Sequence, residues 1–169
     1  MSEFRKISTA EWTENPFRLI GQDFMLLTAT DLAGNSNPMT ASWGGVGVLW
    51  NLPVAFLFIR PQRHTHSLAQ TGERFTASFF PEEYRSMLTY MGKHSGRDGD
   101  KAAACHLTPA KDEHGAVYYE EARLVLSLRK LYAAPLKEEC FFLPSLLAHY
   151  PKKDYHTVYV TEITEILQK

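Results

Sequence analysis

The stretch NPMTASWGG, residues 37–45, is the segment from which the fold and the site of this protein are best predicted. It lies where the flanking sequence has the pattern of a β-strand, yet it combines a proline, two glycines, two hydroxyl side chains and a tryptophan. Paired glycines let a backbone lie flat against a ligand because no Cβ intervenes, although a barrel corner or a β-bulge also favours glycine. Thr40 and Ser42 contribute hydroxyls beside main-chain N–H donors. We therefore expect this strand end either to contact a flat ligand or to turn a corner of a sheet.

The sequence on both sides of this stretch predicts short strands connected by turns. An apolar run at residues 24–30 leads into the turn signal DLAGNSN, residues 31–37, so residues 39–43 are expected to pair back as a hairpin. Residues 53–59 are almost entirely apolar and predict a strand buried on both faces. Pro61 is expected to end that strand, because proline cannot donate a ladder hydrogen bond.

Further strands and short helices are predicted downstream. Thr65 is expected to be the N-cap of a helix over residues 66–70, with Gly72 just past its end. Residues 84–91 have apolar residues at helical spacing. The other predicted elements are strands at 75–80, 116–132 (with a bulge near 120–122) and 155–167, a polar loop at 92–101, a short helix near 102–105 and an insertion with a short helix at 139–150.

These elements favour an antiparallel barrel over alternating strand–helix units. The prediction amounts to about six or seven strands with two or three short helices, in one domain over residues 1–169, with residues 1–14 as a lead-in arm. The sequence contains neither GxGxxG nor GxxxxGK[ST]. A dinucleotide-binding Rossmann unit and a phosphate-binding P-loop are therefore not supported.

The composition excludes several classes of function. Hydrophobic residues make up 44% of the chain and charged residues 22%, with a formal net charge of -1, so no nucleic-acid surface is expected. No apolar run approaches the roughly 20 residues of a membrane span, and the N-terminus lacks the apolar region of a signal peptide. Cys105 and Cys140 form no CxxC pair and are expected to be reduced, and no metal site is predicted. We expect a cytoplasmic protein.

Two basic segments predict anion contacts. In RPQRHT, residues 60–65, Arg60 and Arg63 precede the helix that Thr65 is expected to cap, which would bring two guanidinium groups to unpaired helix N–H groups. In SGRDGDK, residues 95–101, Lys101 and less surely Arg97 could reach the same anion. The alternative is that these cations are solvated loop residues beside an ordinary N-cap.

Taken together, these segments resemble the flavin reductase-like family, the FMN-binding split barrels, and in particular its flavoredoxin-like branch. The resemblance rests on NPFRLIG (15–21), NPMTASWGGVGVLWNLPVAFLFIRPQRHT (37–65), FTASFF (75–80), SGRDGDK (95–101) and the strand from 121 to 132. These segments occur in the order of the family and span nearly the whole chain. The long central segment is the specific one.

The resemblance implies a non-covalently bound FMN at the interface of a homodimer, with the ring along the segment quoted first. It implies flavin chemistry without a catalytic side chain, with NAD(P)H as a transient donor. A non-enzymatic FMN electron carrier served by a redox partner protein stays open, as does a small-ligand barrel without redox function. The large aromatics Trp43, Trp50, Phe79 and Phe80 are expected to be covered in the dimer. The residues implied in cofactor binding are Asn37, Met39, Thr40, Ala41, Ser42, Trp43, Arg60, Arg63, Thr65 and Lys101.

Overall fold

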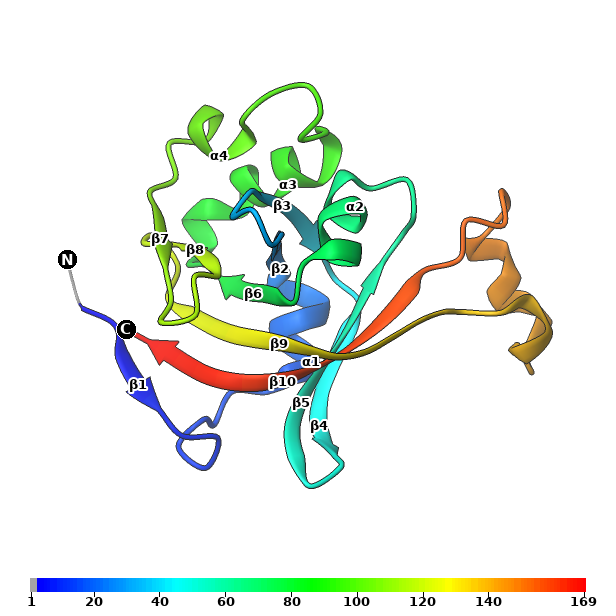
Figure 1. The fold of residues 1–169 in the computed structure, drawn as a ribbon, viewed down its shortest axis with the longest axis horizontal. Coiled ribbons are helices and arrows are strands. Elements are labelled where there is room, and N and C mark those ends of the chain that lie inside the picture. Colours follow the sequence, from blue (N-terminus) through cyan, green and yellow to red (C-terminus); the bar gives the residue numbers. More distant parts are fainter. Residues whose placement is uncertain (1–2) are drawn as a thin grey trace.

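The main sheet of the protein is antiparallel and curls into a split barrel with short helices packed against it (Figure 1). The computed structural model describes residues 3–169. Its strands are β1 (Arg5–Ile7), β2 (Met25–Thr30), β3 (Ser36–Ala41), β4 (Gly44–Leu49), β5 (Leu52–Ile59), β6 (Arg74–Phe79), β7 (Pro109–Lys111), β8 (Val117–Tyr119), β9 (Leu124–Pro135) and β10 (Thr157–Gln168).

Neighbouring strands of the main sheet pair in the order β3-β2-β6-β9-β10-β5-β4, with β1 also paired to β10, while β7 and β8 form a separate hairpin. This order confirms the antiparallel barrel predicted from the sequence. The described residues form ten strands, however, and not six or seven. The prediction missed β1 and β7 because three residues are too short for a periodic pattern, and β4 because glycine weakens the strand pattern.

The helical segments are short and lie between the strands. They are α1 (Pro16–Arg18), the π-helix η1 (Leu19–Asp23), α2 (His64–Thr71), η2 (Glu82–Tyr84), α3 (Arg85–Lys93), α4 (Lys101–Ala104), η3 (Glu138–Cys140) and η4 (Pro144–His149). In the described part of the chain, no helix is long and apolar enough to cross a membrane.

The start and the end of α2 differ from the prediction. Arg63 occupies the N-cap position, without a side-chain capping bond, and Thr65 lies inside the first turn. The hydroxyl of Thr65 instead accepts a hydrogen bond from the Asn37 amide, and this bond replaces the capping bond expected for a threonine here. The helix does end before Gly72, whose backbone is extended. A Cβ on Gly72 would lie 2.0 Å from the Thr30 carbonyl oxygen, so close packing explains this glycine.

Residues 116–132 were predicted as one long strand or a bent pair with a bulge. The structure has two strands in different sheets, separated by a turn in which the Ala122 N–H donates to the Tyr119 carbonyl at 3.1 Å. The bulges lie elsewhere, where β10 pairs with β9. A turn and a bulge interrupt the apolar pattern in the same way, so the sequence could not distinguish them.

Strand β5 buries one face from Ala55 to Ile59 and the other face only in part, which corrects the prediction of a strand buried on both faces. Ala55, Leu57 and Ile59 pack into the barrel core, whereas Phe56 and Phe58 on the opposite face stay partly exposed. The prediction also placed Phe79 and Phe80 among the aromatics in need of cover. Both are buried within the chain itself.

The barrel is split between β3 and β4. These strands follow one another in the chain but lie at opposite ends of the sheet order, so each has one sheet partner among the described residues. Ser42 and Trp43 cross the gap between them. One edge of β3 therefore presents main-chain N–H and C=O groups that no neighbouring strand uses.

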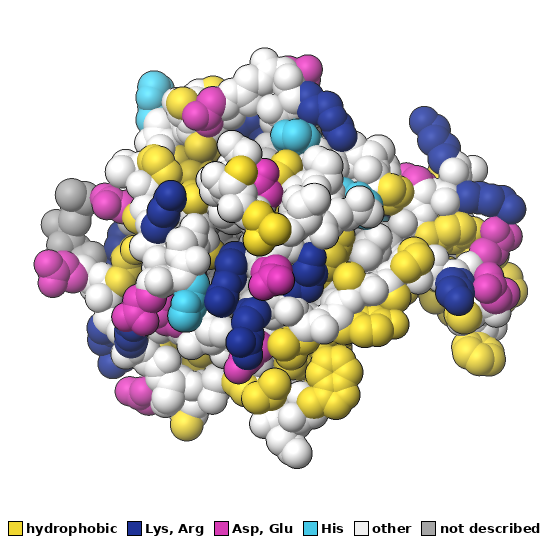
Figure 2. All heavy atoms as spheres, viewed as in Figure 1, with side chains coloured by type: hydrophobic (Ala, Val, Ile, Leu, Met, Phe, Trp, Pro, Cys, Tyr) yellow, Lys and Arg dark blue, Asp and Glu magenta, His cyan; other side chains and the backbone are white. Residues whose placement is uncertain are grey.

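Residues 136–156 form an arm that projects from the ends of β9 and β10 (Figure 1). This arm contains the insertion predicted at residues 139–150, and the single short helix expected there is replaced by the two 3₁₀ turns η3 and η4. Its tip is apolar and open, since Phe142 is 102% exposed and Leu143 is 57% exposed. Figure 2 shows hydrophobic side chains on this arm and over the hairpin of β4 and β5.

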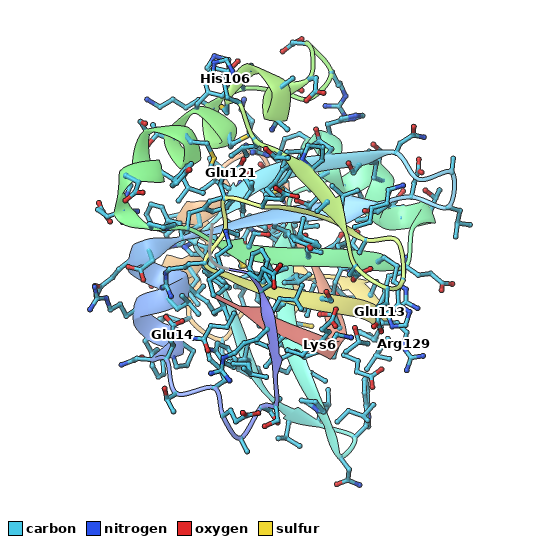
Figure 3. The ribbon with its side chains drawn as sticks, turned by 90° about the vertical axis from the view of Figure 1, so that its left-hand side faces the viewer. Lys6, Glu14, His106, Glu113, Glu121 and Arg129 are labelled. Carbon is cyan, nitrogen blue, oxygen red and sulfur yellow. The ribbon has the colours of Figure 1, made fainter. Side chains whose placement is uncertain are left out.

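The N-terminal strand β1 is fastened to the opposite side of the barrel. Lys6 Nζ donates to the carboxylate of Glu113, in the loop between β7 and β8, at 2.6 Å (Figure 3). It also lies 2.6 Å from the carboxylate of Glu165 on β10. The lead-in arm predicted at residues 1–14 thus includes a strand that pairs with β10. This region lies outside the site described next.

Candidate functional site

The edge of β3 forms one wall of a cavity of about 220 Å³, here called the strand-edge cavity. Trp43 is 45% exposed at its mouth, and the hydroxyl of Thr40 donates to the Leu88 carbonyl on α3. That bond uses the hydroxyl proton of Thr40, so this hydroxyl could only accept a hydrogen bond from a ligand. The lining residues are Met39, Thr40, Ala41, Ser42, Trp43, Phe58, Arg60, Arg63 and His156.

A second cavity of about 240 Å³, here called the basic cavity, adjoins the first and shares Met39 and Arg63 with it. None of the described residues that line it is an aspartate or a glutamate. The first N–H groups of α2 have no partner within the helix and add partial positive charge. The lining residues are Asn37, Met39, Gln62, Arg63, His64, Thr65, Lys93, His94, Ser95, Gly96, Arg97 and Lys101.

Two cations of the basic cavity also bind the C-terminal carbonyls of α3. Arg63 Nη1 donates to the Gly92 carbonyl at 2.9 Å, and Lys101 Nζ donates to the carbonyls of Met91 and His94 at 3.2 and 3.1 Å. Burial, assisted by the charge of Arg63, lowers the pKa of Lys101 to about 8. Burial also lowers the pKa of Arg63. The negative end of α3 thus holds two positive groups beside the cavity.

Asn37 connects three segments of the basic cavity. Its amide nitrogen donates to Thr65 Oγ1 at 2.7 Å, which joins β3 to the first turn of α2. A Cβ on Gly96 would lie 1.7 Å from Asn37 Oδ1, so only glycine lets the loop of residues 94–100 approach this closely. Asn37 and Thr65 therefore shape the cavity and use much of their own polar capacity in doing so.

Arg60 lies apart from Arg63 and faces the arm. Its Nη1 donates to Asp154 at 2.7 Å and its Nη2 donates to the His149 carbonyl at 2.8 Å. It lines the strand-edge cavity but does not line the basic cavity. Both arginines therefore line the strand-edge cavity, but only Arg63 also lines the basic cavity at the start of α2.

His156 belongs to the site and was missed by the sequence analysis. It precedes β10, is 8% exposed, and its ring centroid lies 5.3 Å from that of Trp43. Burial first, and then the charge of Arg60, lower its pKa to about 4, so its imidazole is neutral at pH 7. No local pattern identifies it, because it comes from the far end of the chain. Across residues 3–169, no group of three or more His, Cys, Asp or Glu side chains could hold a metal ion.

Comparison of solved structures finds the same fold in several flavoproteins. An FMN-binding protein from Thermus thermophilus with bound p-hydroxybenzaldehyde aligns at TM-score 0.68 and 21% identity, covering 98% of this chain and 82% of its own. Flavoredoxin of Desulfovibrio vulgaris (Miyazaki F) aligns at TM-score 0.67 and 22% identity, covering 96% and 75%. An FMN-binding domain of a flavin reductases-like enzyme from Shewanella baltica OS155 aligns at TM-score 0.71 and 13% identity, covering 99% and 79%.

At these identities the structural likeness shows the fold, and the family is shown by the sequence. No curated protein matches the chain in sequence. The family described as flavin reductase like domain matches residues 17–168, which include both cavities. The chain therefore belongs to the flavin reductase-like family.

Proposed function

We propose that the protein binds FMN non-covalently, with the isoalloxazine ring in the strand-edge cavity and the phosphate in the basic cavity. The observation that carries this proposal is the pair of adjoining cavities that share Met39 and Arg63. One has an unpaired strand edge as a wall for a flat polar ring, and the other joins cations to the start of α2. The residues present fit both halves of a flavin mononucleotide.

The residues of the chain would have separate tasks. Ala41 at the end of β3 and Ser42 just after it would offer main-chain groups to the polar rim of the ring, while Trp43 would close one side. Arg63 uses Nη1 for Gly92, which leaves its other N–H groups for a phosphate. Lys101 would add charge to the same end of the site. Bound FMN would supply the hydride and electron transfer, so no side chain is assigned as a general acid or base.

NAD(P)H is the proposed electron donor, which would make the protein a flavin reductase-type oxidoreductase. A dedicated dinucleotide fold is not seen in the described residues, so the nicotinamide would dock transiently on the open mouth beside Trp43. A non-enzymatic electron carrier is the second candidate, because the structural neighbours include flavoredoxins. In that case a partner protein would dock at the same opening of the strand-edge cavity beside Trp43. We also infer that the protein works in the cytoplasm.

A homodimer is proposed for the working state. Trp43 and Trp50 are 45% and 58% exposed, and the strand-edge cavity is open beside Trp43. A second copy would cover these aromatics, as expected from the sequence, although Phe79 and Phe80 need no such cover.

The experiment is an absorbance spectrum of the purified protein, before and after addition of FMN. The proposal expects a yellow protein whose flavin is released by heat or acid. A colourless protein that takes up no added FMN would contradict it and would leave a small-ligand barrel as the alternative. Steady-state oxidation of NAD(P)H by the FMN-loaded protein in air, where dioxygen takes the electrons from the reduced flavin, separates the enzyme from the carrier, because only the enzyme accepts electrons from NAD(P)H without a partner protein.

A further inference from the structure

The guanidinium of Arg60 joins the end of β5 to the base of the arm. Besides its bonds to Asp154 and the His149 carbonyl, it lies 5.0 Å from the centre of the Tyr150 ring. Gln62 Nε2 donates to the same Asp154 oxygen at 2.7 Å. The Arg60 side chain is 24% exposed and the Asp154 side chain 18% exposed, so this charge pair is partly shielded from water. The base of the arm is therefore held by directed contacts.

The segment held in this way forms one wall of the strand-edge cavity. The Tyr150 hydroxyl lies 2.8 Å from His156 Nδ1, and both side chains are buried. The rings of His149 and His156 both lie 5.3 Å from the Trp43 ring. The position of Trp43, at the mouth of the cavity, thus depends on the segment that Arg60 holds.

We propose that Arg60 is a positioning residue: through Asp154, the His149 carbonyl and the Tyr150 ring it holds residues 149–156 so that the Tyr150 hydroxyl fixes the His156 imidazole as a wall of the strand-edge cavity. In this arrangement we assign His156 Nδ1 as the acceptor of the phenol hydrogen, which places the imidazole proton on Nε2. Nε2 has no hydrogen bond within the described residues, and it is available as a donor to a bound ligand. The role of the ligand rests on the proposed function, whereas the network itself does not.

This role differs from the phosphate clamp that the sequence predicts for Arg60. A phosphate ligand would affect FMN and leave riboflavin unchanged, because riboflavin has no phosphate. A residue that positions the ring wall affects both flavins by the same factor. Arg60→Gln should therefore weaken FMN and riboflavin equally, by roughly 2- to 30-fold. Loss of affinity for FMN alone would overturn the proposal.

The imidazole of His156 gives a readout that needs no cofactor. The charged and titratable groups around it are Arg60 after β5 and Tyr150 and Asp154 in the arm, with His149 against the same Trp43 ring. Nitrogen-15 NMR of the ligand-free protein should show protonated Nε2 and bare Nδ1 at neutral pH. In Arg60→Gln the fixed tautomer should be lost and the pKa of His156 should rise, because a nearby positive charge is removed.

Two further variants make the test decisive. Tyr150→Phe keeps the ring and removes the hydroxyl, so it should release the His156 tautomer even if Arg60→Gln folds poorly. Arg129→Gln is the matched control, because Arg129 pairs with Glu162 on the sheet away from both cavities, and it should change neither the imidazole nor the flavin affinities. An imidazole unchanged in both Arg60→Gln and Tyr150→Phe would overturn the proposal. If the wild type binds no flavin but its imidazole responds as stated, the proposed function fails and the positioning role stands.

Discussion

Replacing Arg63 by alanine is the sharpest test of how the two cavities divide a flavin mononucleotide. Arg63 lines both cavities, and its Nη1 is held by the Gly92 carbonyl at 2.9 Å, which orients the rest of the guanidinium before any ligand arrives. A hydrogen bond to a charged group contributes about 1.5–3 kcal/mol. Since about 1.4 kcal/mol is one decade in affinity, Arg63→Ala should weaken FMN binding roughly 10- to 150-fold. Riboflavin affinity should change little.

The assay is a fluorescence titration of FMN and riboflavin against the wild type and the variants. Arg63→Lys should recover only part of the loss, because an ammonium group cannot hold the Gly92 carbonyl and a phosphate as a planar fork does. Arg97→Ala is the matched control: Arg97 is exposed and donates to the Gln62 carbonyl at 3.1 Å, so its loss should cost less. Unchanged FMN affinity in Arg63→Ala, or an equal loss for both flavins, would refute a phosphate contact by Arg63.

The remaining predictions concern stability, charge, assembly and donor choice. Gly72→Ala should destabilise the fold by about 1–3 kcal/mol in urea denaturation, because its Cβ would lie 2.0 Å from the Thr30 carbonyl oxygen; Gly21→Ala, with nothing within 4 Å, should not, and equal effects would contradict the packing argument. The pKa of Lys101 is about 8 in the folded state against 10.5 for a free lysine, so the folded protein binds fewer protons between these values and its free energy of unfolding gains a contribution that rises with pH through that window. Lys101→Met should remove this rise, and denaturation midpoints with the same pH slope in both proteins would show that the lysine is not desolvated. Light scattering should show a dimer, whose interface is expected to bury more than about 2,000 Å² in total; a monomer that binds FMN equally well would exclude a shared site. Initial rates with NADH and NADPH should differ little, because the sequence shows no motif for a pocket that binds the 2′-phosphate of NADPH. A strong preference for either donor would reveal a missed binding element.

The fold class could be predicted from the sequence because it depends on local patterns of apolar residues and turn residues. Alternating and continuous apolar runs predict strands wherever one or both faces are buried, and the turn at residues 31–37 predicts the β2–β3 hairpin. The NPMTASWGG segment stood out through local features, and its residues 39–43 line the strand-edge cavity, whereas Gly44 and Gly45 do not. The three-residue strands β1 and β7 and the break near Ala122 were not predicted, because the limits of these strands depend on which sheet each one joins.

The separate roles of the residues in the site depend on the tertiary structure. Arg60 and Arg63 are three residues apart, yet one turns to Asp154 in the arm and the other to Gly92 on α3. His156 reaches the Trp43 ring from a position 113 residues further along the chain (156 − 43). A sequence shows which side chains can donate, accept or carry charge. Which partner each one meets depends on segments brought together by the closing of the barrel, and no local pattern records those contacts.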